Sequence, residues 1–501
     1  MVDSSSPSLQ RHFGLLQATA LNVTMIVGAG VFITIPLMLK ELPGPYALLG
    51  WLLAGAVMVV DGMIWGEFGA TLPGSGGSYL YLLESFGRER WGRLMAFLFI
   101  WQFLISGPLE LGSGLIAIAQ FSSGLSENFK AFSEDHTLKG ILWESEGLAI
   151  SFGPARIFAI LLGILIVFLL YRRIDILGKL TVTIWIGVLA VIGWILVEGF
   201  LHFDSSVAFQ PVAPNSEPMQ HFASGLGAAM RLAMYSYLGY YSICYIGDEV
   251  RNPGKTIPRA VLLSALLVCV LFISLHLAML GTVSWSSVPT DGPDLDNYSL
   301  AAAFMRRIHG DWAVKLVTVL LIWSCFGSAF AGLLSYSRIP YGAARYGHFF
   351  SALGEVHAVH RIPHVSLMFV GGLMLFWSLF DLQTVIDALI TTRIIEQFIC
   401  QIVGVILLRR RQPERLRPYK MWLYPLPCGL ALAGWLFMYL TARPLFIVLG
   451  LTTLLAGALM FCLWSARTGG WPFRTPPWSQ NSWKGRDSRK EDDLLHEKED
   501  G

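Results

Sequence analysis

Two glycines, Gly28 and Gly30, lie in the middle of a run from Gly14 to Leu39 that carries no charged side chain. Glycine weakens a helix, and a broken helix inside a bilayer leaves backbone N–H and C=O groups that only protein, water or a ligand can satisfy. The positive end of the half-helix after such a break favours an anion. These residues therefore suit the binding of a small carboxylate. Close helix packing is the alternative use of two such glycines.

A second glycine-interrupted stretch, Tyr235–Ser242, has a central Gly239, two serine hydroxyls and four aromatic rings within an apolar run. Paired interrupted helices in corresponding places of two halves indicate a binding site for a small molecule at the middle of the membrane. This pairing favours a ligand site over simple packing for Gly28 and Gly30.

Glu110 lies in the middle of an apolar run, just after Pro108. Ionisable groups inside a membrane are costly and mark functional positions. Three roles stay open for Glu110: it senses an amine on the ligand, carries a proton, or serves as a neutral structural hydrogen-bond donor. Arg393 and Glu396 are spaced by three residues, which predicts a structural ion pair on one helical face. Asp61 has no evident partner.

The elements that carry these residues are membrane helices, because only 14% of the residues are charged against about 25% in soluble domains. A window of about 19 residues predicts an all-α integral membrane protein with twelve transmembrane helices. The spans cover roughly 14–39, 46–70, 92–122, 154–171, 177–201, 221–247, 258–283, 312–338, 363–380, 383–408, 423–441 and 444–465.

Lysine and arginine gather in the loops after every second span, for example at Arg409, Arg410 and Arg411, and the opposite loops are richer in acids such as Asp294 and Asp296. Because cytoplasmic loops are the basic ones, both termini are predicted to be cytoplasmic. All six cysteines lie in or beside apolar runs and are predicted to be reduced. The mixed-charge tail after Ser465 is expected to be disordered.

Several motifs resemble the amino acid-polyamine-organocation permeases over most of residues 10–430. The motifs that carry the resemblance are Gly28–Phe32, Gly66–Phe68, Leu72–Tyr81, Asp248–Pro253, Ile257–Ala260, Ser337–Arg338, Ala344–Gly347, Arg417–Lys420 and Leu423–Pro425. Their order within a twelve-span chain makes the resemblance specific.

The resemblance implies a five-plus-five inverted repeat with broken helices 1 and 6 and alternating access. The implied division is a cytoplasmic N-terminus (1–13), a first five-helix repeat (14–201), a second five-helix repeat (202–408), peripheral helices 11 and 12 (409–465) and a cytoplasmic tail (466–501).

The family's site, carried over by position, implies that the backbone of the first break holds a substrate carboxylate and that the second break holds its amine. The implied carboxylate cradle is Gly28, Ala29, Gly30 and Val31, and the implied amine site is Ser236, Tyr237 and Leu238. Tyr235 is the implied aromatic gate, and Glu110 is a further candidate for substrate contact. On the cytoplasmic side, we expect Asp248, Glu249 and Arg251 to pair with neighbouring basic loops in one state of the transport cycle.

The resemblance implies a plasma-membrane secondary transporter for amino acids, with neutral ones expected. A polyamine or cationic amino acid carrier, as symporter or exchanger, is the alternative, and an amino acid sensor is the rival of another class. We expect no enzymatic activity, no cofactor, no metal, no nucleic acid and no disulfide-linked partner, only lipid and a small substrate. Several relatives carry a lysine in the middle of the fifth span, where the register of this sequence puts Val188, so coupling to protons or to sodium stays open. Serine oxygens such as those of Ser324 and Ser328 are candidate sodium ligands.

Overall fold

The computed structural model describes residues 11–28, 30–122, 125–143, 148–172, 174–212, 221–289, 299–345, 351–380 and 389–467. The expected cytoplasmic tail lies almost wholly outside these ranges, as does nearly all of the expected N-terminal segment.

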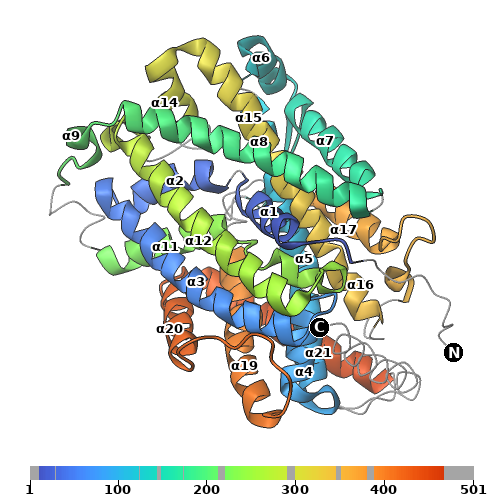
Figure 1. The fold of residues 1–501 in the computed structure, drawn as a ribbon. Coiled ribbons are helices and arrows are strands. Elements are labelled where there is room, and N and C mark those ends of the chain that lie inside the picture. The colour runs from blue at the N-terminus through green and yellow to red at the C-terminus, as the bar shows by residue number, and fades with distance from the viewer. Residues whose placement is uncertain are drawn as a thin grey trace.

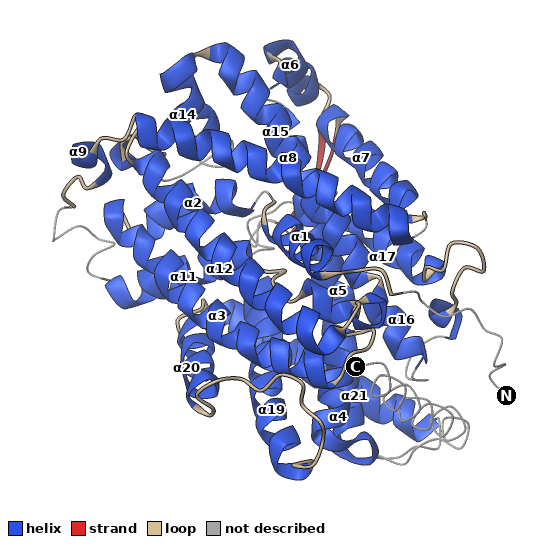
Figure 2. Ribbon diagram, in the orientation of Figure 1, coloured by secondary structure: helices blue, strands red, loops and turns tan. Residues whose placement is uncertain are grey.

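The described chain is mostly helical, as predicted (Figures 1 and 2). Its α-helices are α1 (Leu15–Ile26), α2 (Gly30–Glu41), α3 (Ala47–Thr71), α4 (Ser78–Phe86), α5 (Gly92–Ser122), α6 (Glu127–Asp135), α7 (Pro154–Leu170), α8 (Ile174–Leu201), α9 (Ser205–Ala208), α11 (Phe222–Tyr237), α12 (Pro253–Leu280), α14 (Leu300–His309), α15 (Asp311–Tyr336), α16 (Arg338–Arg345), α17 (His364–Trp377), α19 (Cys400–Arg411), α20 (Leu426–Leu440) and α21 (Pro444–Arg467).

Shorter helical turns connect several of these helices. The 3₁₀ turns are η1 (Gly44–Tyr46), η5 (Ser242–Tyr245), η6 (Gly247–Glu249), η7 (Trp285–Ser287) and η8 (Ser351–Gly354), and the π-helical segments are η2 (Gly87–Trp91) and η9 (Ile394–Ile399).

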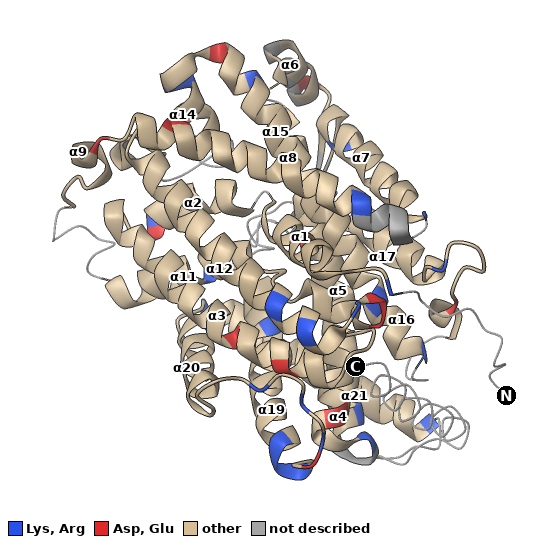
Figure 3. Ribbon diagram, viewed as in Figure 1, with Lys and Arg blue, Asp and Glu red and all other residues tan. Residues whose placement is uncertain are grey.

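Seven helices of the described chain are long and apolar enough to cross a membrane, or eight if α1 and α2 form one bent span. Helices α7, α17 and α20 are shorter apolar helices. The chain is therefore a multi-pass membrane protein, while the count of twelve spans stays a prediction. Figure 3 shows lysine and arginine gathered near the ends of α19, α4 and α16.

One β-hairpin is an addition that the all-helical expectation did not include. Strands β1 (Leu138–Trp143) and β2 (Leu148–Phe152) pair antiparallel, with Leu138 opposite Phe152. The hairpin lies between α6 and α7, in the segment that joins the predicted spans 92–122 and 154–171.

The core forms where the interrupted helices pack against long continuous ones. Helix α3 contacts α11, α12 and α20, α5 contacts α15 and α17, and α1 lies among α8, α12 and α15 (Figure 1). Helix α12 begins with Pro253 at its first position, where the missing N–H costs nothing because the first N–H groups of a helix have no partner inside it. The long helices thus hold both interrupted segments in the middle of the bundle.

Candidate functional site

The first helix break lies between α1, which ends at Ile26, and α2, which begins at Gly30. The directions of the two helices differ by 44°. Gly28 turns the chain tightly, since its N–H donates to the carbonyl of Ile26 at 2.9 Å. A Cβ on Gly28 would lie 2.7 Å from the Cβ and Oγ of Ser328, so only glycine lets α15 approach this closely. Ala29 lies outside the described residues.

The polar groups at this break are partly satisfied from α15. The last carbonyls of a helix lack partners inside it, and the hydroxyl of Ser328 donates to the carbonyl of Met25 at 2.6 Å. On the other side of the break, the first N–H groups of α2 also have no partner within their helix. They carry the positive end of the α2 dipole, which begins at Gly30.

The second break follows α11, which ends at Tyr237. Leu238 leaves the helix with ψ of 141°, and Gly239 has φ of +110°, a conformation that favours glycine. The chain then continues as the short 3₁₀ turn of Ser242–Tyr245. Residues 238–241 are therefore not helical, in the middle of an apolar stretch.

Asn22, which the sequence analysis did not single out, joins the two breaks. Its Nδ2 donates to the carbonyl of Tyr240 at 2.7 Å and to Ser264 Oγ at 3.2 Å, and its Oδ1 accepts the N–H of Ile243 at 2.9 Å. The side chain is fully buried. The sequence does contain a signal that could have identified this residue, namely an isolated asparagine in an apolar run. A buried amide needs several hydrogen-bond partners.

Asn22→Ala is expected to lower the thermal stability of the purified protein and to impair substrate binding. The change leaves the Tyr240 carbonyl and the Ile243 N–H buried without partners, at a cost of about 1–3 kcal/mol for each group. Ser264→Ala is the matched control, because it removes one of the three bonds and spares the unwound segment. Equal melting temperatures for the Asn22→Ala and Ser264→Ala proteins would contradict the joining role of Asn22.

The two breaks meet at a cavity of about 40 Å³, which is room for roughly three water molecules. Four elements supply its walls: both helix breaks, α5 and α15. The lining residues are Met25, Ile26, Gly28, Gly30, Glu110, Leu111, Ser113, Gly114, Tyr235, Ser236, Leu238, Ser328 and Ala329. Six of the nine candidate site residues thus lie around one space.

The side chains of two other candidate residues lie away from the cavity. Val31 is fully buried in the apolar core. The hydroxyl of Tyr237 donates to the carbonyl of Trp51 at 3.3 Å, and its ring stacks on Phe272. Neither residue is among those that line the cavity. Val31 and Tyr237 can therefore contact a ligand only through their backbone groups.

Tyr235 is fixed against α5 by a short chain of hydrogen bonds. The hydroxyl of Ser113 donates to the carbonyl of Glu110 at 2.6 Å, which leaves its oxygen to accept the hydroxyl of Tyr235 at 2.9 Å. The Tyr235 ring is 9% exposed and lines the cavity. This ring therefore lines the cavity in a defined orientation, and its role as a gate stays a prediction.

Glu110 forms an ion pair with Arg393 Nη1 through Oε2, and the same oxygen accepts the hydroxyl of Tyr336 at 2.8 Å. The predicted pairing of Arg393 with Glu396 is wrong. Residues 394–399 form the π-helical segment η9. A spacing of three residues puts two side chains on one face of an α-helix, but not in the wider turn of a π-helix. A carboxylate on a different helix neutralises Arg393.

Among the described residues, no group of three or more histidine, cysteine, aspartate or glutamate side chains is arranged to hold a metal ion. The serines that we considered as sodium ligands bind backbone carbonyls: Ser324 Oγ donates to Leu320 at 3.1 Å, and Ser328 Oγ donates to Met25. Coupling to sodium or protons therefore stays a prediction.

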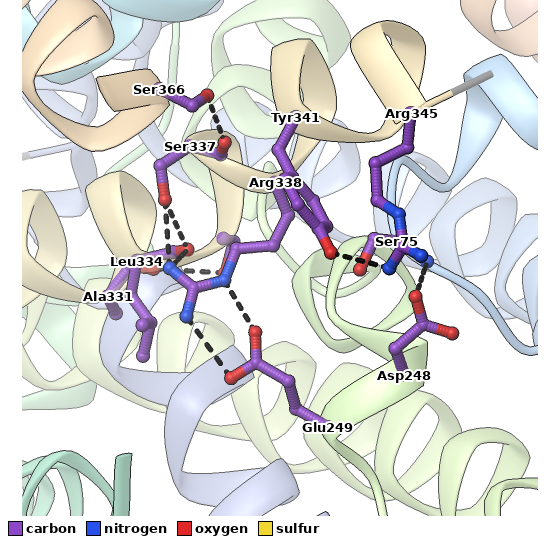
Figure 4. Close-up of polar contacts among 11 residues, drawn as sticks. Ser75, Asp248, Glu249, Ala331, Leu334, Ser337, Arg338, Tyr341, Arg345 and Ser366 are labelled. Atoms are coloured by element: carbon purple, nitrogen blue, oxygen red, sulfur yellow. Dashed lines mark hydrogen bonds and ion pairs between the residues drawn. The ribbon is translucent and has the colours of Figure 1, made fainter. Parts of the chain in front are cut away.

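A second polar cluster, the Glu249–Arg338 network, consists of Ser75, Asp248, Glu249, Ser337 and Arg338 (Figure 4). Arg338 holds Glu249 through two bonds of 2.7 and 3.1 Å, and both side chains are at most 1% exposed. Arg338 Nη1 also donates to Ser337 Oγ at 2.9 Å, and the N–H of Ser75 donates to Asp248 at 3.0 Å. The network joins α15, α16, η6 and the loop after α3.

Backbone hydrogen bonds tie the start of the described chain to the same network. The N–H groups of His12 and Phe13 donate to the carbonyl of Glu249 at 2.9 and 3.0 Å, and the N–H of Gly76 donates to Tyr245 at 3.1 Å. Glu249 and Asp248 do bind neighbouring segments, as expected. Arg251, the third residue named for this role, is exposed and donates to the carbonyl of Arg11 at 3.3 Å.

A family model described as "Amino acid permease" matches residues 13–462. The serine/threonine exchanger SteT of Bacillus subtilis (strain 168) is 29% identical over 433 residues, which cover 86% of this chain and 90% of that protein. The branched-chain amino acid permease BcaP of the same organism is 23% identical over 470 residues, or 93% and 95% of the two chains. The cationic amino acid transporter 4 of Mus musculus is 28% identical over 426 residues, or 82% of this chain and 62% of that protein.

Proposed function

The chain belongs to the amino acid permease family, and on this premise we propose that it is a secondary active transporter of neutral amino acids in the plasma membrane, working by alternating access. The family and these relatives are transporters, not enzymes. The observation that carries the proposal is the cavity at which two interrupted helices meet.

The substrate carboxylate is held by backbone N–H groups at the break between α1 and α2. The positive end of the α2 dipole faces that break, and the glycines keep the space free of side chains. The substrate amine lies at the end of α11, where the last carbonyls have no helical partner. A zwitterion needs both of its ends paired in a site of low dielectric constant, and this arrangement supplies both.

The neighbouring Glu249–Arg338 network acts as the cytoplasmic gate in this proposal. Its buried ion pair, together with the bonds of Phe13 and Ser75 to the same segment, closes one end of the bundle. Because the basic loops lie on the cytoplasmic side, this end faces the cytoplasm, and both termini lie there too.

A carrier of cationic amino acids or polyamines is the second candidate. It is supported by Glu110 in the cavity wall and by the similarity to the mouse cationic amino acid transporter 4. Against it stands the ion pair of Glu110 with Arg393, which neutralises the carboxylate. We therefore favour neutral substrates.

The proposal is tested by counterflow in proteoliposomes that contain the purified protein. Labelled serine or leucine is supplied outside, unlabelled amino acids or putrescine inside, with and without pH and sodium gradients. Accumulation driven by internal neutral amino acids is the expected result, and the gradients reveal the coupling ion. If nothing moves while an amino acid still stabilises the protein against heat by binding the native state, the protein is a sensor and not a carrier.

Tyr235→Ala is expected to reduce transport roughly ten-fold or more while extraction and melting temperature change little, because a ring that covers the cavity is lost. Tyr235→Phe keeps the ring, loses only the bond to Ser113 and should retain most of the activity. Parallel losses of transport and folded protein in Tyr235→Ala would mean that the ring only packs. Initial uptake rates per amount of folded protein provide the measurement.

A further inference from the structure

Three residues from distant parts of the chain form one polar cluster beside the cavity. Glu110 lies on α5, Tyr336 ends α15, and Arg393 directly precedes the π-helical segment η9. The side chains of Arg393 and Glu110 are 3% and 8% exposed. Glu110 itself lines the cavity and Arg393 does not, so Arg393 reaches the cavity only through its ion pair with Glu110.

The cluster is incompletely satisfied. Glu110 Oε2 takes both the Arg393 contact and the Tyr336 hydroxyl, whereas Oε1 has no hydrogen bond to any residue that the structure describes. Arg393 Nε and Nη2 are buried and likewise lack a partner in the described part of the chain. Buried donors without partners are costly, and π-helical segments often mark functional sites. Hydrogen-bonding groups that lack a partner in this way indicate a place for a ligand.

The charge balance restricts what that ligand can be. Among the described residues that line the cavity, Glu110 alone carries a formally charged side chain, and Arg393 cancels that charge. A cationic or anionic substrate side chain would therefore enter a site of low dielectric constant without a free counter-ion, which is unfavourable. A neutral group that donates a hydrogen bond meets Glu110 Oε1 at no such cost.

The polar groups of the cavity wall restrict the ligand further. Ser113, Ser236 and Ser328 contribute hydroxyl groups to a wall that also contains apolar side chains, so a polar substrate side chain finds hydrogen-bond partners there.

We infer that the Glu110–Arg393 pair selects amino acids with a neutral, hydrogen-bond-donating side chain such as a hydroxyl. Glu110 contacts that side chain, and Arg393 is a positioning residue that neutralises and orients Glu110. The inference rests on the proposed function and names the substrate class of the same cavity.

Replacing either residue of the pair should leave the charge of the other residue unpaired, and that charge should then change the substrate preference. Arg393→Met leaves the Glu110 carboxylate alone, so the preference for 2,4-diaminobutyrate over serine should rise roughly ten-fold or more. Glu110→Gln leaves the Arg393 guanidinium alone and should raise the preference for aspartate over serine by a similar factor. The readout is the ratio of counterflow rates, together with stabilisation of the purified protein by each amino acid.

Two controls separate selectivity from folding. The double variant Glu110→Leu/Arg393→Met has neither a formal charge nor a hydrogen-bond acceptor at this place, so it should still reject both charged amino acids but lose the preference for serine over alanine. Arg409→Met breaks the pair of Arg409 with Glu67, which joins α19 to α3 and does not line the cavity. That variant should lose stability without any change in the charge preference.

The possible outcomes distinguish the two levels of the proposal. If the wild-type protein carries amino acids but both single variants lose all substrates in equal proportion, the pair is only structural and the inference is overturned. The same holds if leucine is carried better than serine. If the wild-type protein neither carries nor binds any amino acid, the proposed function itself fails, and the inference falls with it.

Discussion

Replacing Gly30 with leucine is expected to abolish amino acid binding and transport while the protein still folds and can be extracted from the membrane. A Cβ at this position would lie 3.2 Å from Ser236 Cα and 3.3 Å from Ser236 Oγ. The nearer atom belongs to the backbone and cannot move aside as the tip of a side chain can. The further carbons of leucine would then occupy the gap between the two helix breaks, where the proposal puts the substrate carboxylate.

Ligand-dependent stabilisation measures this effect directly. A saturating substrate at 100 times its Kd stabilises the native state by about 2.7 kcal/mol, and Gly30→Leu should show no such rise in melting temperature. Gly30→Ala should weaken binding without abolishing it, since its single carbon makes only the tight contact with Ser236. Gly372→Leu on α17 is the matched control, because its Cβ would meet nothing within 4 Å. Normal affinity in Gly30→Leu would refute the backbone cradle.

Arg338→Met is expected to lower the stability of the closed gate more than any exposed charge replacement does. The change leaves the Glu249 carboxylate buried without its partner, and removing one side of a buried pair costs about 3–5 kcal/mol. Arg338 also fixes the Leu334 carbonyl at 2.8 Å, so the junction of α15 and α16 loosens as well. We expect a marked fall in melting temperature and loss of concentrative uptake.

The double variant Glu249→Gln/Arg338→Met removes the buried charge and should recover part of the stability but not the transport. Arg306→Met is the matched control: the ion pair of Arg306 with Asp311 is solvent-exposed, and exposed pairs contribute little. Thermal unfolding and uptake are measured on the same preparations. An unchanged melting temperature in Arg338→Met would show that the pair does not hold the gate closed.

The family was readable from the sequence, and so were the two places beside glycines at which α1 and α11 end. Gly28, Gly30 and Gly239 interrupt apolar runs, and an interruption inside a membrane requires a polar environment around the exposed backbone. That requirement is local, so it can be inferred without knowing which helices are neighbours. The inverted repeat, the domain boundaries and the orientation stay predictions from the resemblance and from the basic loops.

The sequence could not show in which direction each side chain of α11 points. Successive helical residues differ by about 100° in direction, so Tyr235, Ser236 and Tyr237 cannot all face one cavity. The structure turns Tyr235 toward Ser113, Ser236 toward Thr34 and Tyr237 toward Trp51. Which face meets the cavity depends on the packing of α11 against α2 and α3.

The partners of the buried polar groups were decided by the tertiary structure alone. Glu110 and Arg393 are 283 positions apart in the chain, Asp61 accepts the hydroxyl of Tyr240 on another segment, and Asn22 binds the unwound segment after α11 and Ser264 on α12. The sequence by itself determined that these groups must find partners, because an unpaired polar group in an apolar interior is costly. Only the folded arrangement of the helices decided which partners they found, since helices distant in sequence become neighbours through packing.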